Sequence, residues 1–190
     1  MRLVIAASLL FTGIGVAQET RLGSKIHDFA VQDLNGKRIT FSELKGQTTV
    51  LIFIANQCPV TNGYVERMNS LYADFTRRRV HFIFINANAT ELGASIAAHA
   101  KDYALTFPVY KDDQNVVADY VGAHTTPEAF VVDGSGIVRY HGAIDDSLNP
   151  GRVRKQWLRN ALEAVIAGKP VERAETKTLG CAIHRARPSL

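Results

Sequence analysis

Residues 50–59 read VLIFIANQCP, and the architecture of the chain follows from this stretch. The run from 49 to 55 is almost entirely apolar and does not alternate with polar residues, which is typical of a strand covered on both faces. Cys58 and Pro59 follow at once, and an apolar stripe with helical spacing runs over 62–79. Proline is favoured in the first turn of a helix, where its missing N–H has no intrahelical partner. The stretch therefore predicts a buried strand, a turn carrying Cys58, and a helix.

Cys58 is predicted to lie at the N-terminus of that helix. The unpaired N–H groups and the helix dipole favour a negatively charged sulfur at this position. The thiolate is the reactive form of cysteine. A free cysteine that follows a strand is more often a small buried hydrophobic residue. The order strand, Cys-Pro, helix favours a redox-active thiol instead.

The chain has two cysteines, and the second is Cys181 in the sequence GCAIH at 180–184. Two cysteines are too few for a disulfide scaffold, although they suffice for one bridge. Thr61 stands where a second cysteine would complete a Cys-x-x-Cys motif. Cys58 therefore acts alone or pairs with Cys181, which the extended tail from Pro170 brings within reach at about 3.3 Å per residue. The alternative for Cys181 is an inert thiol in a loose tail.

The N-terminal segment 1–17 has the features of a secretory signal peptide. A short positive start precedes an apolar run, and small residues precede a cleavage position after Ala17. The apolar run is too short to cross a bilayer comfortably, and an uncleaved anchor is the alternative. We expect an exported protein, periplasmic or secreted, in a compartment where disulfides persist. The predicted organisation is one domain over 18–170 and a C-terminal tail over 171–190 that carries Cys181.

The charge pattern excludes some classes of partner. The chain has 22 basic and 18 acidic residues, and the excess is scattered. Its basic clusters are not interleaved with aromatic residues, and no nucleic-acid-binding motif accompanies them. We expect no nucleic-acid partner, no cofactor, and no stable membrane association after signal cleavage.

The remaining pattern predicts an α/β fold with a central mixed sheet and helices on both faces. Asn35-Gly36 between two short strand-like runs indicates an N-terminal β-hairpin. Later in the chain, a Gly-Ser-Gly turn at 134–136 indicates a second hairpin. The expected elements are strands at 28–31, 38–41, 49–55, 80–86, 130–133 and 137–140, and helices at 62–79, 91–103, 115–121 and 153–167.

Pro127 lies directly before the strand predicted at 130–133. A proline is tolerated at the entry of a strand because it interrupts no ladder hydrogen bond there. The bond before a proline is usually trans. In this strand order we expect a cis bond between Thr126 and Pro127, and a loop that lies against Cys58.

Two histidines lie near the cysteines in the expected arrangement. His124 precedes the Thr-Thr-Pro loop, and His184 follows Cys181 by three residues. A soft ligand set of Cys58, Cys181 and one of these histidines would suit Cu(I). A metal-handling module is therefore one alternative function, although the spacing matches no metal-binding motif. A binding domain stapled by a permanent disulfide is the other alternative.

Taken together, these motifs resemble the redoxin, or peroxiredoxin-like, branch of the thioredoxin superfamily. Within it, the chain is similar to exported proteins related to alkyl hydroperoxide reductase/thiol-specific antioxidant domains. The resemblance covers nearly the whole chain after the signal segment. It is carried by Asp28-Phe29, by 44–46, by 56–59 with Tyr64, by 85–88, by 126–130 with Asp133, by 142–146, and by 180–183.

The resemblance implies a thioredoxin-like fold and a thiol-dependent oxidoreductase. Cys58 would be the nucleophile, and Cys181 the resolving thiol. Pro127 would shape the substrate groove, and Thr61 would stand beside Cys58 in place of a second cysteine. The implied partners are a protein disulfide or a peroxide as substrate, and an electron donor that the resemblance does not specify.

Three positions depart from the pattern of peroxiredoxins. Those proteins place a threonine or serine three residues before the reactive cysteine and a proline seven residues before it, where this chain has Ala55 and Leu51. They carry an arginine where this chain has Pro127, which is similar to the cis-proline of thioredoxins. The choice between disulfide and peroxide substrates stays open on these residues.

Overall fold

The computed structural model describes residues 22–186 of the chain. The predicted signal segment 1–17 lies outside the described residues. The strands are β1 (Ala30–Gln32), β2 (Arg38–Thr40), β3 (Thr48–Ile54), β4 (Val80–Asn86), β5 (Val109–Lys111), β6 (Thr125–Thr126), β7 (Glu128–Asp133), β8 (Val138–Gly142) and β9 (Cys181–Ala182). The helices are α1 (Phe41–Leu44), α2 (Pro59–Thr76), α3 (Gly93–Asp102), α4 (Val116–Val121) and α5 (Trp157–Ile166), with short 3-10 turns η1 (Asp113–Asn115) and η2 (Pro150–Arg152).

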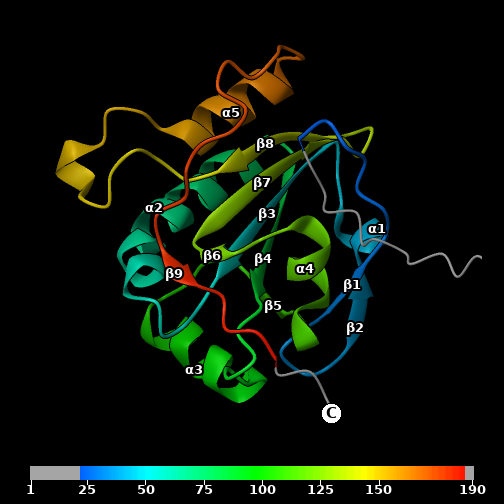
Figure 1. Cartoon of the computed structure of the whole chain (residues 1–190), viewed down its shortest axis with the longest axis vertical. Coiled ribbons are helices and arrows are strands. Elements are labelled where there is room, and N and C mark those ends of the chain that lie inside the picture. Colours follow the sequence, from blue (N-terminus) through cyan, green and yellow to red (C-terminus); the bar gives the residue numbers. More distant parts are fainter. Residues whose placement is uncertain (1–21, 187–190) are drawn as a thin grey trace, which may run out of the picture.

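Seven strands form one mixed sheet in the order β2-β1-β5-β4-β3-β7-β8 (Figure 1). β3 lies at its centre, parallel to β4 and antiparallel to β7. β1 and β2 form the expected N-terminal hairpin, and β7 and β8 form the second one. The mixed α/β fold predicted from the sequence is confirmed.

Both faces of β3 are covered, as its unbroken apolar run predicts. Val50 and Ile52 pack on one face with residues of α2, α3 and α5. Leu51 and Phe53 pack on the other face with residues of α1 and α4. The period of two along a strand sends successive side chains to opposite faces. Two apolar cores therefore hold the strand whose end carries Cys58.

Several boundaries differ from the prediction. α2 begins at Pro59 rather than at 62, because Cys58 is the N-cap and Pro59 occupies the first turn. α3 begins only at Gly93, and Leu92 before it is 70% exposed. α5 begins at Trp157 rather than at 153, after the 3-10 turn η2.

The C-terminal segment 171–186 packs along the domain. Thr176 is buried, and its hydroxyl bonds the backbone N–H of Ala143 and the hydroxyl of Tyr140. Further on, β9 pairs with β6 in a second, two-stranded sheet (Figure 1). The sequence of segment 171–186 shows no helical or strand periodicity. The segment is extended, and many of its contacts are made by the backbone. Within the described range 22–186, no helix has both the length and the apolar character needed to cross a membrane.

Candidate active site around Cys58 and Cys181

Cys58 is the N-cap residue of α2, as the sequence predicts. The backbone N–H of Thr61 points at the Sγ atom of Cys58, and the nitrogen and the sulfur are 3.3 Å apart. The positive end of the dipole of an 18-residue helix faces the same sulfur. These groups favour negative charge on the sulfur when it is reduced. The side chain of Cys58 is nevertheless only 2% exposed.

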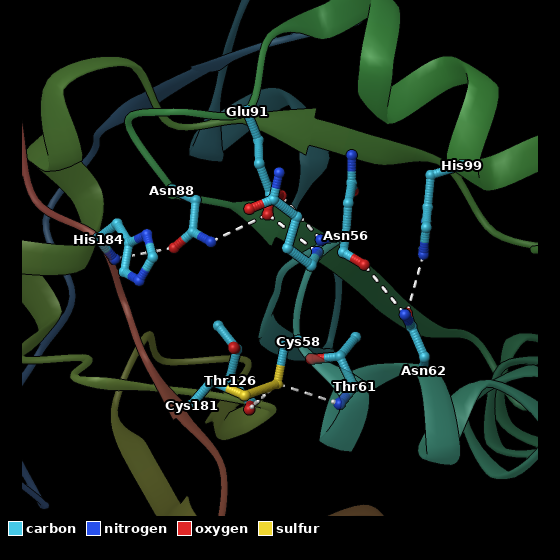
Figure 2. Close-up of a disulfide and its surroundings, with 11 residues drawn as sticks. Asn56, Cys58, Thr61, Asn62, Asn88, Glu91, His99, Thr126, Cys181 and His184 are labelled. Atoms are coloured by element: carbon cyan, nitrogen blue, oxygen red, sulfur yellow. Dashed lines mark hydrogen bonds between the residues drawn. A yellow bond between two sulfur atoms is a disulfide. The ribbon is translucent and has the colours of Figure 1, made fainter.

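Cys58 is joined to Cys181 by a disulfide, with the two Cα atoms 5.8 Å apart (Figure 2). The pairing expected between the two cysteines is confirmed. The bridge connects positions 123 residues apart in the chain. Cys181 is partly exposed, whereas Cys58 is buried. The two residues of the bridge therefore differ in their exposure to solvent.

The loop before β7 completes the site. The peptide bond between Thr126 and Pro127 is cis, as expected. The carbonyl oxygen of Thr126 lies 3.1 Å from Sγ of Cys58. A disulfide sulfur carries no proton, so this is a close contact in the oxidised protein, and the reduced thiol can donate a hydrogen bond there. The loop thus lies against Cys58, where the sequence places it.

The C-terminal segment crosses this loop as a strand. Thr126 lies opposite Cys181, and Thr125 opposite Ala182, in antiparallel register. Ile183 continues the contact, because its N–H donates to the carbonyl of His124 and its side chain is buried in the core. The backbone edge before Pro127 is therefore occupied by the chain itself, and Cys58 lies beneath that cover.

Gly180 is needed for this close approach. A Cβ atom at this position would lie 2.2 Å from the carbonyl oxygen of Thr126 and 2.7 Å from its carbonyl carbon. Both contacts are with backbone atoms, which do not move aside as a flexible side chain does. Any side chain at 180 would push the tail, and Cys181 with it, away from the loop.

Two buried hydroxyls lie beside the disulfide (Figure 2). The side chains of Thr61 and Thr126 are each 1% exposed, and neither Oγ1 atom has a hydrogen-bond partner within residues 22–186. Buried polar atoms are normally paired. Both hydroxyls are therefore unpaired in the oxidised protein, within the residues that the structure describes.

A buried carboxylate, Glu91, supports the loop before Cys58. Its two oxygens accept the backbone N–H groups of Asn56 and Gln57, at 2.7 and 3.0 Å. Burial raises the pKa of Glu91, but the hydrogen bonds from Asn86, from these two N–H groups and from Asn88 outweigh burial, so the pKa lies below its ordinary value. Sequence reasoning did not identify Glu91, because it lies in a segment predicted to be the start of a helix.

A second buried carboxylate, Glu128, supports the loop before Pro127. It accepts the backbone N–H groups of His124 and Thr125, each at 2.8 Å, and pairs with Nε2 of His141 at 2.5 Å. Burial raises the pKa of Glu128, but the hydrogen bonds from His141 and from both N–H groups outweigh it, so the pKa lies below its ordinary value. Nothing in the local sequence marks this pair, since the partners come from different strands.

Glu128→Gln is expected to weaken the acid dependence of stability. A carboxylate with a depressed pKa stabilises the fold above its unfolded pKa of about 4.3, and this contribution is lost as the pH falls through the lower folded value. The variant should lose about 1–3 kcal/mol at pH 7 and show a shallower loss below about pH 4. Thermal unfolding of both oxidised proteins from pH 7 to pH 2 measures this, and parallel curves would contradict it.

The copper alternative concerns the two reduced cysteines and stays a hypothesis, because the structure shows them oxidised. Both thiol sulfurs are used in the disulfide, and no group of three or more His, Cys, Asp or Glu side chains suited to a metal ion occurs in the part of the chain that the structure describes. His124 and His184 are exposed, and each is held through its backbone N–H, by Glu128 and Asn88 respectively. The structure thus brings the two cysteines together but forms no metal site with either histidine.

A cysteine capping a helix beside a cis-proline loop, on a mixed sheet of this strand order, defines a thiol-dependent oxidoreductase of the thioredoxin superfamily. The chain belongs to the AhpC/TSA family, whose model matches residues 22–141. The match ends before Cys181, so the C-terminal cysteine lies outside the part of the chain that the family model covers.

The chain is similar in sequence to curated proteins and in structure to solved ones. The thiol-disulfide oxidoreductase ResA of Halalkalibacterium halodurans is 30% identical over 122 residues, which are 64% of this chain and 68% of ResA. An uncharacterized conserved protein from Geobacillus kaustophilus has a solved structure with TM-score 0.81 and 27% identity, covering 90% of this chain and 94% of that one. A secreted Mycobacterium tuberculosis disulfide oxidoreductase matches in fold, with TM-score 0.54 and 20% identity over 74% of this chain and 95% of that one.

Proposed function

We propose that this protein is an exported thiol–disulfide oxidoreductase that cycles between a Cys58–Cys181 disulfide and two thiols. The observation that carries the proposal is the disulfide itself, formed by a cysteine that caps α2 and touches the loop before the cis Pro127. An inert bridge needs neither a helix N-terminus nor a close carbonyl at one of its sulfurs. The predicted signal segment 1–17 supports export to a compartment where such a bridge persists.

In the reduced protein, the thiolate of Cys58 attacks one sulfur of a substrate disulfide. A Cys58–substrate bond forms, the substrate disulfide breaks, and one substrate thiolate leaves. The thiolate of Cys181 then attacks the Cys58 sulfur, so that the Cys58–Cys181 bond forms and the second substrate thiolate leaves. The substrate gains two electrons, and the protein loses two.

Thr61 and Pro127 assist the first of these steps. The backbone N–H of Thr61 already lies 3.3 Å from the Cys58 sulfur, and its hydroxyl is buried beside it. Both groups stabilise the thiolate that attacks and leaves. Pro127 fixes the loop whose carbonyl touches that sulfur and whose outer edge is a strand partner.

An extended peptide is the substrate class that this edge fits. β9 already pairs there as an antiparallel strand, and strand addition by backbone hydrogen bonds is a general mode of peptide recognition. Because β9 covers Cys58 in the oxidised protein, the tail must move off β6 for a peptide substrate to pair there in its place. A disulfide in an unfolded or flexible protein segment meets this requirement.

The return step begins at Cys181. In the oxidised protein Cys58 is 2% exposed and Cys181 is partly exposed, so an external thiolate reaches the sulfur of Cys181. Its attack forms a mixed disulfide with Cys181 and releases Cys58 as the thiolate, which the α2 N-terminus stabilises. A second external thiolate then attacks the donor sulfur of this mixed disulfide. The thiolate of Cys181 leaves, and the two donor sulfurs form the oxidised donor.

Turnover with two kinds of oxidant tests the proposal. The protein, an excess of an external dithiol, and either a disulfide-bonded peptide or hydrogen peroxide are mixed, and loss of dithiol is followed. We expect catalytic loss of dithiol with the peptide, well above the uncatalysed rate. Turnover with peroxide alone would assign the site to a peroxidase. A bridge that the dithiol does not open in the folded protein would favour the stapled binding domain.

A further inference from the structure

The carboxylate of Glu91 is the centre of a buried network of amide donors (Figure 2). Its Oε2 atom accepts the backbone N–H of Asn56 and the side-chain amide of Asn86, at 2.7 and 2.5 Å. Its Oε1 atom accepts the backbone N–H of Gln57 and the side-chain amide of Asn88, both at 3.0 Å. All four donors are N–H groups, and Glu91 is 1% exposed. The carboxylate therefore fixes the turn immediately before Cys58.

Asn88 extends the same network to the other cysteine. While its amide nitrogen donates to Glu91, its Oδ1 atom accepts the backbone N–H of His184, at 2.9 Å. The N–H of Ala89 donates in turn to the carbonyl of His184, also at 2.9 Å. His184 follows Cys181 by three residues. One carboxylate and one amide thus connect the turn before Cys58 with the segment after Cys181.

A buried lysine, Lys111, contacts the network around the Glu91 carboxylate. Lys111 is 9% exposed and donates from Nζ to the carbonyl oxygen of Asn88, at 2.8 Å. Burial lowers the pKa of this lysine, and Asp112, Asp113 and, to a smaller extent, Glu91 oppose that by favouring its charged form. A buried carboxylate that accepts several N–H groups and lies near a cation remains ionised at neutral pH. The network is consequently held by charge-assisted hydrogen bonds, which are stronger than neutral ones.

We propose that Glu91, acting through Asn88, is the positioning residue that sets the stability of the Cys58–Cys181 disulfide. The contacts between Glu91 and the turn at 56–57 do not require the tail. Those between Asn88 and His184 require the tail to lie on β6, which the disulfide enforces. Glu91 orients Asn88 for those contacts, so its loss weakens the oxidised protein more than the reduced one. The inference rests on the proposed redox cycle of this pair.

Glu91→Gln tests the inference because it keeps the shape and changes the donors. One carboxylate oxygen becomes an NH₂ group that faces N–H donors and cannot accept from them. We expect the equilibrium constant for forming the Cys58–Cys181 disulfide, measured against mixtures of reduced and oxidised glutathione, to fall about tenfold or more. Asn88→Ala removes the link to His184 and leaves the turn at 56–57 held. The equilibrium constant of this variant should also fall. In the double variant the fold-change should be smaller than the product of the two single fold-changes, because Glu91 acts through Asn88.

Glu66→Gln is the matched control, because Glu66 is an exposed residue on α2 and undergoes the same chemical change. Thermal unfolding of the oxidised and the reduced form of each variant is measured alongside. If Glu91 only stabilised the fold, both forms would lose equal stability and the equilibrium constant would not change, which would overturn the inference. If the wild-type cysteines fail to equilibrate with glutathione at all, the proposed redox cycle itself fails.

Discussion

Replacing Cys58 with serine is expected to lower the turnover of a disulfide-bonded peptide by about a thousandfold or more, as loss of a nucleophile does in other enzymes. A serine hydroxyl at the same helix N-terminus stays protonated at neutral pH and cannot form the mixed disulfide. Cys181→Ser is expected to differ in kind. Its Cys58 still attacks the substrate, but no second thiol releases the product, so the reaction stops at a Cys58–substrate disulfide.

Turnover of the two variants is compared in the same dithiol-coupled assay, and each reduced variant is separately mixed with the disulfide-bonded peptide without dithiol for mass spectrometry of the intact protein. The prediction is no adduct in Cys58→Ser and one peptide adduct per chain in Cys181→Ser. Unchanged turnover in Cys58→Ser would contradict the role of Cys58. Full turnover in Cys181→Ser would show that the external donor, rather than Cys181, resolves the mixed disulfide.

The second large effect is expected for Gly180→Ala. The added methyl group would lie 2.2 Å from the Thr126 carbonyl oxygen, so the tail must shift and take Cys181 with it. The disulfide should become about five- to 150-fold less stable against glutathione, since a forced contact in a packed region costs roughly 1–3 kcal/mol. At the same time, Cys58 of the reduced variant should react faster with a bulky alkylating reagent, because the tail covers it less tightly.

Gly63→Ala provides the matched control for this substitution. Gly63 lies within α2, and a Cβ atom there would meet nothing within 4 Å. Alanine is also the better helix former, so the fold should not suffer. If Gly180→Ala, like Gly63→Ala, left both the disulfide equilibrium and the alkylation rate of Cys58 unchanged, the close approach at Gly180 would not hold Cys181 in place.

The parts of the site that the sequence predicts are those governed by local chemistry. The turn carrying Cys58 follows from an apolar strand, a proline and a helical stripe that are contiguous in the chain. The cis bond at Pro127 follows from the strand order and from the family resemblance. Neighbouring residues therefore determine the turn at Cys58, whereas the cis bond is predicted from the order of the strands and from the resemblance.

The parts that the sequence does not predict depend on residues far apart in the chain. β9 has only two residues, too few for a periodic pattern in the sequence. Its position depends on the backbone of β6 and on the absence of a side chain at Gly180. Glu91 and Glu128 look like ordinary surface acids in the sequence. Their burial becomes intelligible only when the fold brings backbone N–H groups and His141 to them.

Trapping the thiols during a single turnover tests the proposed redox cycle of Cys58 and Cys181 directly. Reduced protein is mixed with one equivalent of a disulfide-bonded peptide, and samples are quenched with an alkylating mass tag and digested. We expect a transient adduct of the peptide on Cys58, followed by one linked peptide that contains Cys58 and Cys181, with two peptide thiols released. If both cysteines remain alkylatable throughout, or if the first adduct is found on Cys181, the proposed cycle is contradicted.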